Sequence, residues 1–193
     1  MTVRERYEEL KKIVSERKAE FDSLMDFVEN ETAYLTAPAS SRFHLSREEG
    51  LLEHSVNVCE NLLKLREAMA PEISVESCVV TALLHDLGKA GMPGRPMYIP
   101  NQPTAKQKQY GFGPSVPYHT TDKLTYLSVP VRSLYLIGPR FPLTEEEAQA
   151  IVYHDGQYVD DNKSAATREC PLLLLLHYAD NWSCFVTEKK REK

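Results

Sequence analysis

The sequence predicts an all-α protein, a helical bundle interrupted by one long segment rich in proline and glycine. Apolar residues recur at helical spacing over most of the chain, and strand-like alternation is scarce. The chain has 193 residues, of which 42% are hydrophobic, with no internal repeat and no second composition regime. A chain of this size and composition can bury one sizeable core, so we expect a single domain over residues 1–193.

Residues 1–32 are expected to form one N-terminal helix with a heptad stripe. Its stripe positions follow alternating steps of four and three: Val3, Tyr7, Leu10, Val14, Arg17, Phe21, Leu24 and Val28. Arg17 interrupts the apolar character, which favours packing across the domain over a free coiled coil. Dimerisation through this helix stays open at this point.

Start signals divide the rest of the chain into further helices. A serine or threonine cap, in two cases followed three residues later by glutamate, and a first-turn proline mark helix starts. These signals occur at Ser46 with Glu49, at Ser74, at Thr144 with Glu147, and at Pro171. The last helix would contain the leucine run 172–176, which is too short to cross a bilayer and predicts a buried helix.

Residues 90–118 break the helical pattern with ten prolines and glycines, and a loop of this length usually binds something. We expect an active-site loop or lid at the mouth of a pocket. Its cations either meet phosphate groups or stay in solvent; they are Arg95, Lys106 and Lys108. Its aromatic side chains either stack on a base or anchor the loop; they are Tyr98, Tyr110, Phe112 and Tyr118.

The pair His85 and Asp86 lies at the glycine-stopped end of an apolar helix. An imidazole beside a carboxylate suits a divalent transition metal, although His-Asp before glycine also serves as a simple helix end. The same arrangement recurs at His154 and Asp155, before Gly156. Two such ends in one chain favour the metal-binding interpretation.

His54 and Asp180 are further candidate ligands. His54 shares the apolar stripe of its helix, and a buried histidine needs a hydrogen-bonding partner or a metal. Asp180 follows the leucine run, where an unpaired carboxylate would be costly. His44 and His177 are expected to have core or hydrogen-bonding roles rather than to bind a metal directly.

The order His54, His85-Asp86, Asp180 resembles the ligand set of the HD superfamily of metal-dependent phosphohydrolases. The similarity runs from about residue 43 to about residue 184. Within it, residues 50–55 and 175–181 look like the HD domains of certain bacterial 3′-to-5′ exoribonucleases, although we expect no counterpart of their OB-fold. The resemblance implies an HD-domain-like helical bundle.

Relatives with two or three metals carry a further histidine and a His-His pair between the second and last ligands. His119 and His154 occupy those places, and Asp155 stands where many relatives have the second histidine. The resemblance thus implies one or two divalent ions, of manganese, iron, cobalt, nickel or zinc. His54, His85, Asp86 and Asp180 would hold the first, and His119, His154 and Asp155 the second.

The implied reaction is hydrolysis of a phosphoester, of a nucleotide or a related small phosphate, by a metal-activated water, with Asp86 bridging the ions. Lys89 either stabilises phosphate charge or neutralises the helix end, and Lys123 is a weaker substrate-binding candidate. The alternative function is a catalytically weak, nucleotide-binding sensor, for which Asp155 is the visible hint.

The formal net charge of −5 argues against broad nucleic-acid binding, so a small phosphorylated partner is favoured over long RNA. The four cysteines lack paired metal-site spacing and are typical of reduced core residues in a cytoplasmic protein; they are Cys59, Cys78, Cys170 and Cys184. The charged N-terminus is unlike a secretory segment, and we expect no membrane partner.

Overall fold

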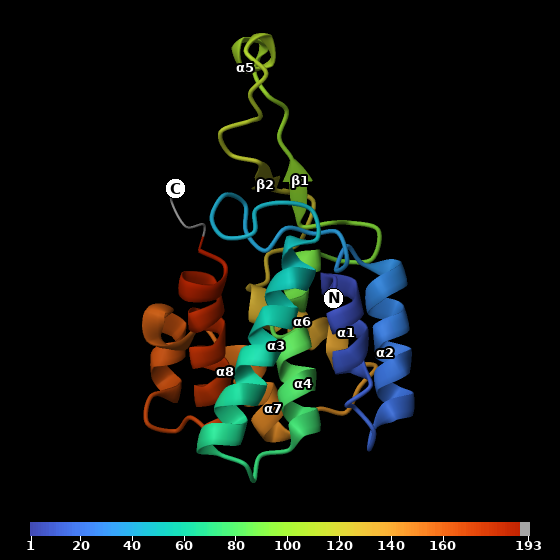
Figure 1. Cartoon of the computed structure of the whole chain (residues 1–193), viewed down its shortest axis with the longest axis vertical. Coiled ribbons are helices and arrows are strands. Elements are labelled where there is room, and N and C mark those ends of the chain that lie inside the picture. The colour runs from blue at the N-terminus through green and yellow to red at the C-terminus, as the bar shows by residue number, and fades with distance from the viewer. Residues whose placement is uncertain (190–193) are drawn as a thin grey trace.

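The computed structural model describes residues 1–189 and has a bundle of helices with a hairpin arm projecting from one end (Figure 1). The predicted all-α fold class is confirmed. Within the described residues, the sheet is one short antiparallel pair, Tyr98–Pro100 (β1) with Tyr118–Thr120 (β2). The α-helices of the bundle are α1 (Val3–Lys11), α2 (Lys18–Glu31), α3 (Gly50–Met69), α4 (Val75–Leu84), α6 (Val129–Ile137), α7 (Glu145–Tyr153) and α8 (Pro171–Trp182).

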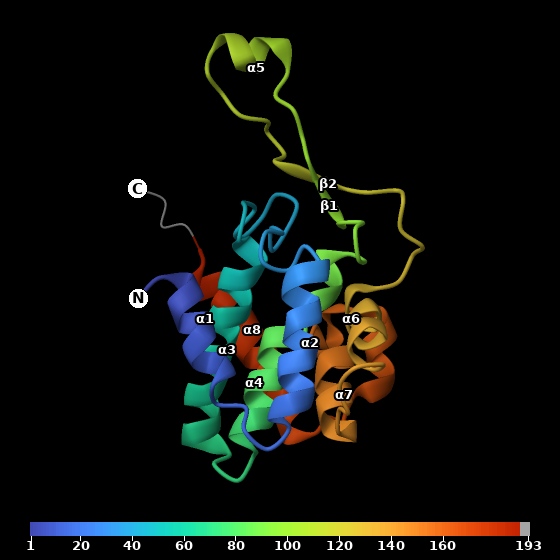
Figure 2. The same ribbon diagram turned by 90° about the vertical axis from the view of Figure 1, so that its right-hand side faces the viewer.

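Helix α4 is the centre of the bundle, because nearly all of its side chains are buried. It packs against α3, α7 and α8, and α8 also packs against α3 and α7. Figures 1 and 2 show that α3 begins and α4 ends at the same end of the bundle, from which the arm rises. The first turns of α3 and the residues after α4 therefore meet at this end.

The predicted leucine-rich buried helix is confirmed as α8, with Leu172, Leu173, Leu175 and Leu176 buried in the core. It continues into a π-helical turn, Ser183–Thr187. Across residues 1–189, no helix combines the length and the apolar character needed to cross a membrane.

The prediction of one continuous helix over residues 1–32 is wrong, because α1 ends at Lys11 and α2 begins at Lys18. Both helices and the turn between them place the stripe residues in the core, so the apolar pattern runs through the break. The backbone N–H groups of Ser15 and Glu16 each donate to the Glu76 carboxylate, at 2.8 Å, instead of continuing a helix. Since the stripe packs inside the chain, we expect any homodimer to use another surface.

Arg17, which interrupts the stripe, connects two carboxylates in the core. Its Nε lies 2.8 Å from Glu76 Oε1, and its two terminal nitrogens contact both oxygens of Glu147, at 2.6 and 2.8 Å. The side chains of Glu76 and Glu147 are 5% and 0% exposed. Burial opposes their ionisation, but hydrogen bonds from Arg17 and the backbone outweigh it and hold both pKa values below the usual range.

The structure confirms the predicted helix starts except the one at Ser46. Thr144 and Glu147 form the expected capping box, with each side chain accepting from the other's backbone N–H. The box predicted at Ser46 is wrong, because α3 begins at Gly50 after Glu49 adopts a left-handed backbone with φ of 61°. Gly50 is required there, since a Cβ would collide with the Leu45 carbonyl oxygen. Ser74 and Pro171 begin α4 and α8 as predicted.

The segment 90–118 is a projecting arm rather than a lid folded over the bundle. Its base is the β1–β2 pair, in which Ile99 lies opposite His119. A short helix, α5 (Ala105–Gln109), lies at its tip, well away from the bundle in both views (Figures 1 and 2). A tip so placed does not cover the end of the bundle where α3 begins.

The Arg17 contacts generate a stability prediction. Arg17→Ala leaves two carboxylates in the core without their counter-charge, and we expect the free energy of unfolding to fall by about 3–5 kcal/mol. The control is Lys18→Ala, which removes an exposed ion pair with Asp22 worth about 0.3–0.5 kcal/mol. Urea unfolding of both variants gives the comparison, and similar losses would rule out the anchoring role of Arg17.

The same contacts predict a pH dependence. Because folding lowers the pKa values of Glu76 and Glu147, their contribution is complete above the ordinary glutamate pKa of about 4.3 and declines as pH falls through the lower folded-state values. The stability difference between wild type and Arg17→Ala should therefore shrink below about pH 4.3. Urea titrations across this range measure it, and a difference that stays constant would contradict the linkage.

Candidate metal centre

Five potential metal ligands gather at the hairpin end of the core: His54, His85, Asp86, His154 and Asp180. They form two overlapping groups, His54–His85–Asp86 and His85–His154–Asp180, in each of which the ligand atoms lie within 4.8 Å of one another. His54 comes from α3 and Asp180 from α8, whereas the other three follow directly after α4 and α7. The four ligands predicted for a first ion are thus together, and His154 joins them.

Asp86 lies at the middle of this group. Its Oδ2 is 3.5 Å from His54 Nε2 and 3.4 Å from His85 Nε2, and its Oδ1 is 3.7 Å from His154 Nε2. Asp180 Oδ1 lies 3.1 Å from His54 Nε2. Imidazole nitrogens and carboxylate oxygens at these separations can share one divalent cation of the first transition row.

The three histidines are held in one tautomer by contacts at Nδ1. His85 Nδ1 donates to the Ala82 carbonyl oxygen at 2.8 Å, and His154 Nδ1 donates to the Ile151 carbonyl oxygen at 2.9 Å. His54 Nδ1 donates to Glu188 at 3.1 Å. Each ring therefore directs the other nitrogen, Nε2, toward the group, which is the orientation that metal-binding histidines take.

The Nε2 atoms of His54 and His85 are buried and make no hydrogen bond. A buried polar atom without a partner costs free energy, and two on facing rings are unusual in a packed core. A cation bound between them would satisfy both. The residues of this group therefore fit a divalent metal.

Neighbouring charges shift the pKa values of Asp86 and His54 in opposite directions. Burial opposes ionisation of Asp86, but the positive charge of Lys89 holds its pKa well below the usual range. Burial also disfavours the charged form of His54, yet the carboxylates of Asp180 and Glu188 outweigh it and raise its pKa to about 10. A divalent cation would compete with protons for these imidazole and carboxylate atoms.

Lys89 forms an ion pair with Asp86 Oδ2 and is 18% exposed. Its ammonium group therefore faces the ligand group rather than capping the carbonyls at the end of α4. Asp180 is 16% exposed, so both side chains keep some contact with solvent.

The three ligands predicted for a second ion are not assembled as expected. His119 lies on β2, is exposed, and contacts Asn101 Oδ1 through Nδ1 at 2.7 Å. Asp155 lies at the rim, 44% exposed, with Oδ1 3.7 Å from His154 Nε2. The projecting arm takes His119 outward, which the ligand order along the sequence could not reveal.

The predicted substrate-binding cations are all exposed and lie on or beside the arm. Arg95 and Lys123 line a groove at its base together with His119. Lys106 and Lys108 lie on α5 at its tip, so the structure does not place them near the ligand group (Figure 1). Tyr110 and Phe112 follow α5 and are also exposed, whereas Tyr98 and Tyr118 are partly buried on β1 and β2.

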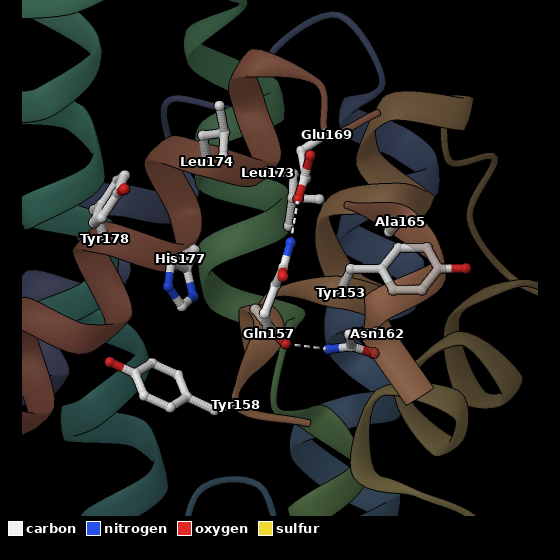
Figure 3. A pocket seen from close by; sticks show the side chains of 11 residues that line it. Tyr153, Gln157, Tyr158, Asn162, Ala165, Glu169, Leu173, Leu174, His177 and Tyr178 are labelled. Carbon is white, nitrogen blue, oxygen red and sulfur yellow. Dashed lines mark hydrogen bonds between the residues drawn. The ribbon is translucent and has the colours of Figure 1, made fainter. Parts of the chain in front are cut away.

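A separate cavity of about 360 Å³ opens between α8 and the turns after α7 (Figure 3). His177 and Tyr158 face it, but none of the five clustered ligands lines it. His177 Nδ1 donates to the His154 carbonyl oxygen at 2.7 Å, which agrees with the predicted hydrogen-bonding role. Gly156, with φ of 61°, leaves room for this ring, because a Cβ would collide with it.

The contacts that Glu188 and Cys184 make near His54 were not predicted from the sequence. Glu188 accepts from His54 Nδ1 and from Asn57 Nδ2, the latter at 3.0 Å, while Cys184 Sγ lies 3.5 Å from His44 Nε2. Asp180, Cys184 and Glu188 are spaced by four, so they follow one face of α8 and its continuation. That spacing was the available signal.

A family model described as an HD domain matches residues 51–181, which is more than half of the chain and includes all five clustered ligands. No curated protein and no solved structure matches the chain.

Metal binding should stabilise the fold through the clustered ligands and not through His119. Mn²⁺ at about 100 times its dissociation constant should add about 2.7 kcal/mol to wild type, since it binds the folded state. We expect a thermal upshift in wild type and in His119→Ala, and none in His85→Ala. Loss of the shift in His119→Ala, or its survival in His85→Ala, would contradict this placement.

Proposed function

Because the chain belongs to the HD domain family, we propose that it is a metal-dependent phosphohydrolase that cleaves a small phosphoester. The observation that carries the proposal is the pair of buried, unpartnered Nε2 atoms of His54 and His85 directed at Asp86. Such a group has the donors for a catalytic ion, and Lys89 and Asp180 beside it keep some contact with solvent.

In this proposal His54, His85, Asp86 and Asp180 hold the ion, and His154 completes its shell or holds part of a second. Mixed nitrogen and oxygen donors suit manganese, iron, cobalt, nickel or zinc. Asp155 is close enough to His154 to join if the rim closes around a second ion.

When bound, a divalent ion lowers the pKa of a water ligand and draws negative charge from a phosphoryl oxygen. The protein contributes orientation, because the Nδ1 contacts fix each imidazole before substrate arrives. Lys89 would balance the negative charge that grows on the phosphoryl group, since its ammonium lies beside the ligand Asp86. Asp86 holds Lys89 in that position.

The substrate we propose is a nucleotide or similar small phosphate, in the cytoplasm. The net charge of −5 opposes attraction of long RNA, whereas one lysine beside the ligands suits a single phosphate. Arg95 and Lys123, which share a groove at the base of the arm, are candidates for a more distant part of the substrate. Four free thiols agree with a reducing compartment.

A second candidate function is a nucleotide sensor with weak catalysis. It is favoured by the position of His119 outside the ligand group and of Asp155 at its rim, which leaves the predicted second-ion set incomplete. A sensor would bind a nucleotide tightly through the first ion without turning it over.

Turnover by metal-loaded protein tests the proposal. We expect hydrolysis within a panel of nucleotides, cyclic nucleotides and short RNA, with manganese, iron, cobalt or nickel supplied. Asp86→Ala should lower kcat by at least about 10³-fold and remove the metal, because several kcal/mol of stabilisation of the transition state depend on the ion. His119→Ala is the matched control and should retain both.

Full activity in Asp86→Ala would refute the assignment of the centre. Tight nucleotide binding by wild type without hydrolysis of any member of the panel would identify the sensor instead.

A further inference from the structure

A second group of potential ligands lies on the other side of His54, formed by His44, Cys184 and Glu188. With His54, their ligand atoms lie within 4.8 Å of one another. His44 Nε2 is 3.5 Å from Cys184 Sγ and 3.9 Å from Glu188 Oε2. Glu188 is 1% exposed and His44 is 20% exposed, so the group is mostly enclosed yet reachable from solvent.

From this geometry we propose a second metal site, in which His44 Nε2, Cys184 Sγ and Glu188 Oε2 bind a thiophilic divalent cation such as zinc. A tetrahedral zinc with Zn–S of about 2.3 Å and Zn–N of about 2.0 Å places sulfur and nitrogen about 3.5 Å apart. The separation of Cys184 Sγ and His44 Nε2 has this value. A thiolate, an imidazole and a carboxylate form a donor set typical of zinc, with water as the fourth ligand on the exposed side.

Glu188 joins His54 to the second group. His54 Nδ1 lies 3.1 Å from Glu188 Oε1 and 3.2 Å from Oε2, Asn57 Nδ2 donates to Oε1 at 3.0 Å, and Oε2 lies 3.9 Å from His44 Nε2. His54 serves the first centre through Nε2, and the two groups touch a second time where Cys184 Sγ donates to Asp180 Oδ1 at 3.4 Å. Metal uptake at the second site would release the Cys184 thiol proton to solvent.

The second group also differs from the first in its place along the chain. His44 precedes the residues matched by the family model, and Cys184 and Glu188 follow them. The site is thus built from segments on either side of that match, in the loop before α3 and in the turn after α8. A cation there would tie these segments together and hold Glu188 against His54.

Cobalt substitution in the full chain tests this site separately from the phosphohydrolase centre. Co²⁺ bound by a thiolate gives a near-ultraviolet charge-transfer band that nitrogen and oxygen ligands do not give. We expect the band in wild type and in Asp86→Ala, which lacks the first centre. Cys184→Ser should lose it, and His44→Ala should require more cobalt to reach it.

Cys170→Ser is the matched control, because Cys170 is also partly exposed but lies before α8, and it should keep the band. No band in wild type, or a band that survives in Cys184→Ser, would overturn the site. If Cys184→Ser does not fold, alkylation of wild type followed by peptide mass spectrometry decides. Zinc must then protect Cys184 and not Cys170, and equal labelling with and without zinc would also overturn the proposal.

Discussion

The burial of Asp86 among imidazoles is the constraint on which the rest of the structure depends. A carboxylate this enclosed is stable only beside positive charge. Lys89 supplies part of that charge, and a cation bound by the two unpartnered imidazole nitrogens would supply the rest. The same constraint explains why His85 and His154 follow helix ends. There, the free carbonyls of Ala82 and Ile151 accept from Nδ1 and turn Nε2 inward.

The fold provides this arrangement by packing helices around α4, whose C-terminal end leads directly into His85 and Asp86. Side chains outside the ligand set also hold the ligands in place. His177 holds the His154 carbonyl, and Glu188 holds His54 from a turn that follows the last helix of the bundle. The C-terminal turn is therefore part of the centre, although it lies outside the span that the family model matches.

The sequence predicted the helical class, the central ligands and the buried leucine helix, because apolar periodicity and helix-end signals are local and survive in the fold. Sequence-based predictions were wrong where one sequence pattern is compatible with two structures. The stripe over residues 1–32 fits either one helix or two that share a core, and the buried Glu76 decides between them by accepting from the turn. Likewise, proline and glycine indicate that residues 90–118 leave the helical pattern, but they do not indicate in which direction the segment runs. His119 was therefore assigned to a second-ion group, whereas in the structure it is exposed on β2 and contacts Asn101. The contacts of His54 with Glu188 and of His44 with Cys184 were not predicted, because they join residues 134 and 140 positions apart, and the four-residue spacing on α8 indicates a shared face but not its partner.

The most direct test of the centre is anomalous diffraction at the manganese absorption edge from crystals grown with Mn²⁺. We expect a peak within coordination distance of His54 Nε2, His85 Nε2, Asp86 and Asp180. A map with no peak there, and with both imidazole nitrogens hydrogen-bonded to water or to the carboxylates instead, would contradict it.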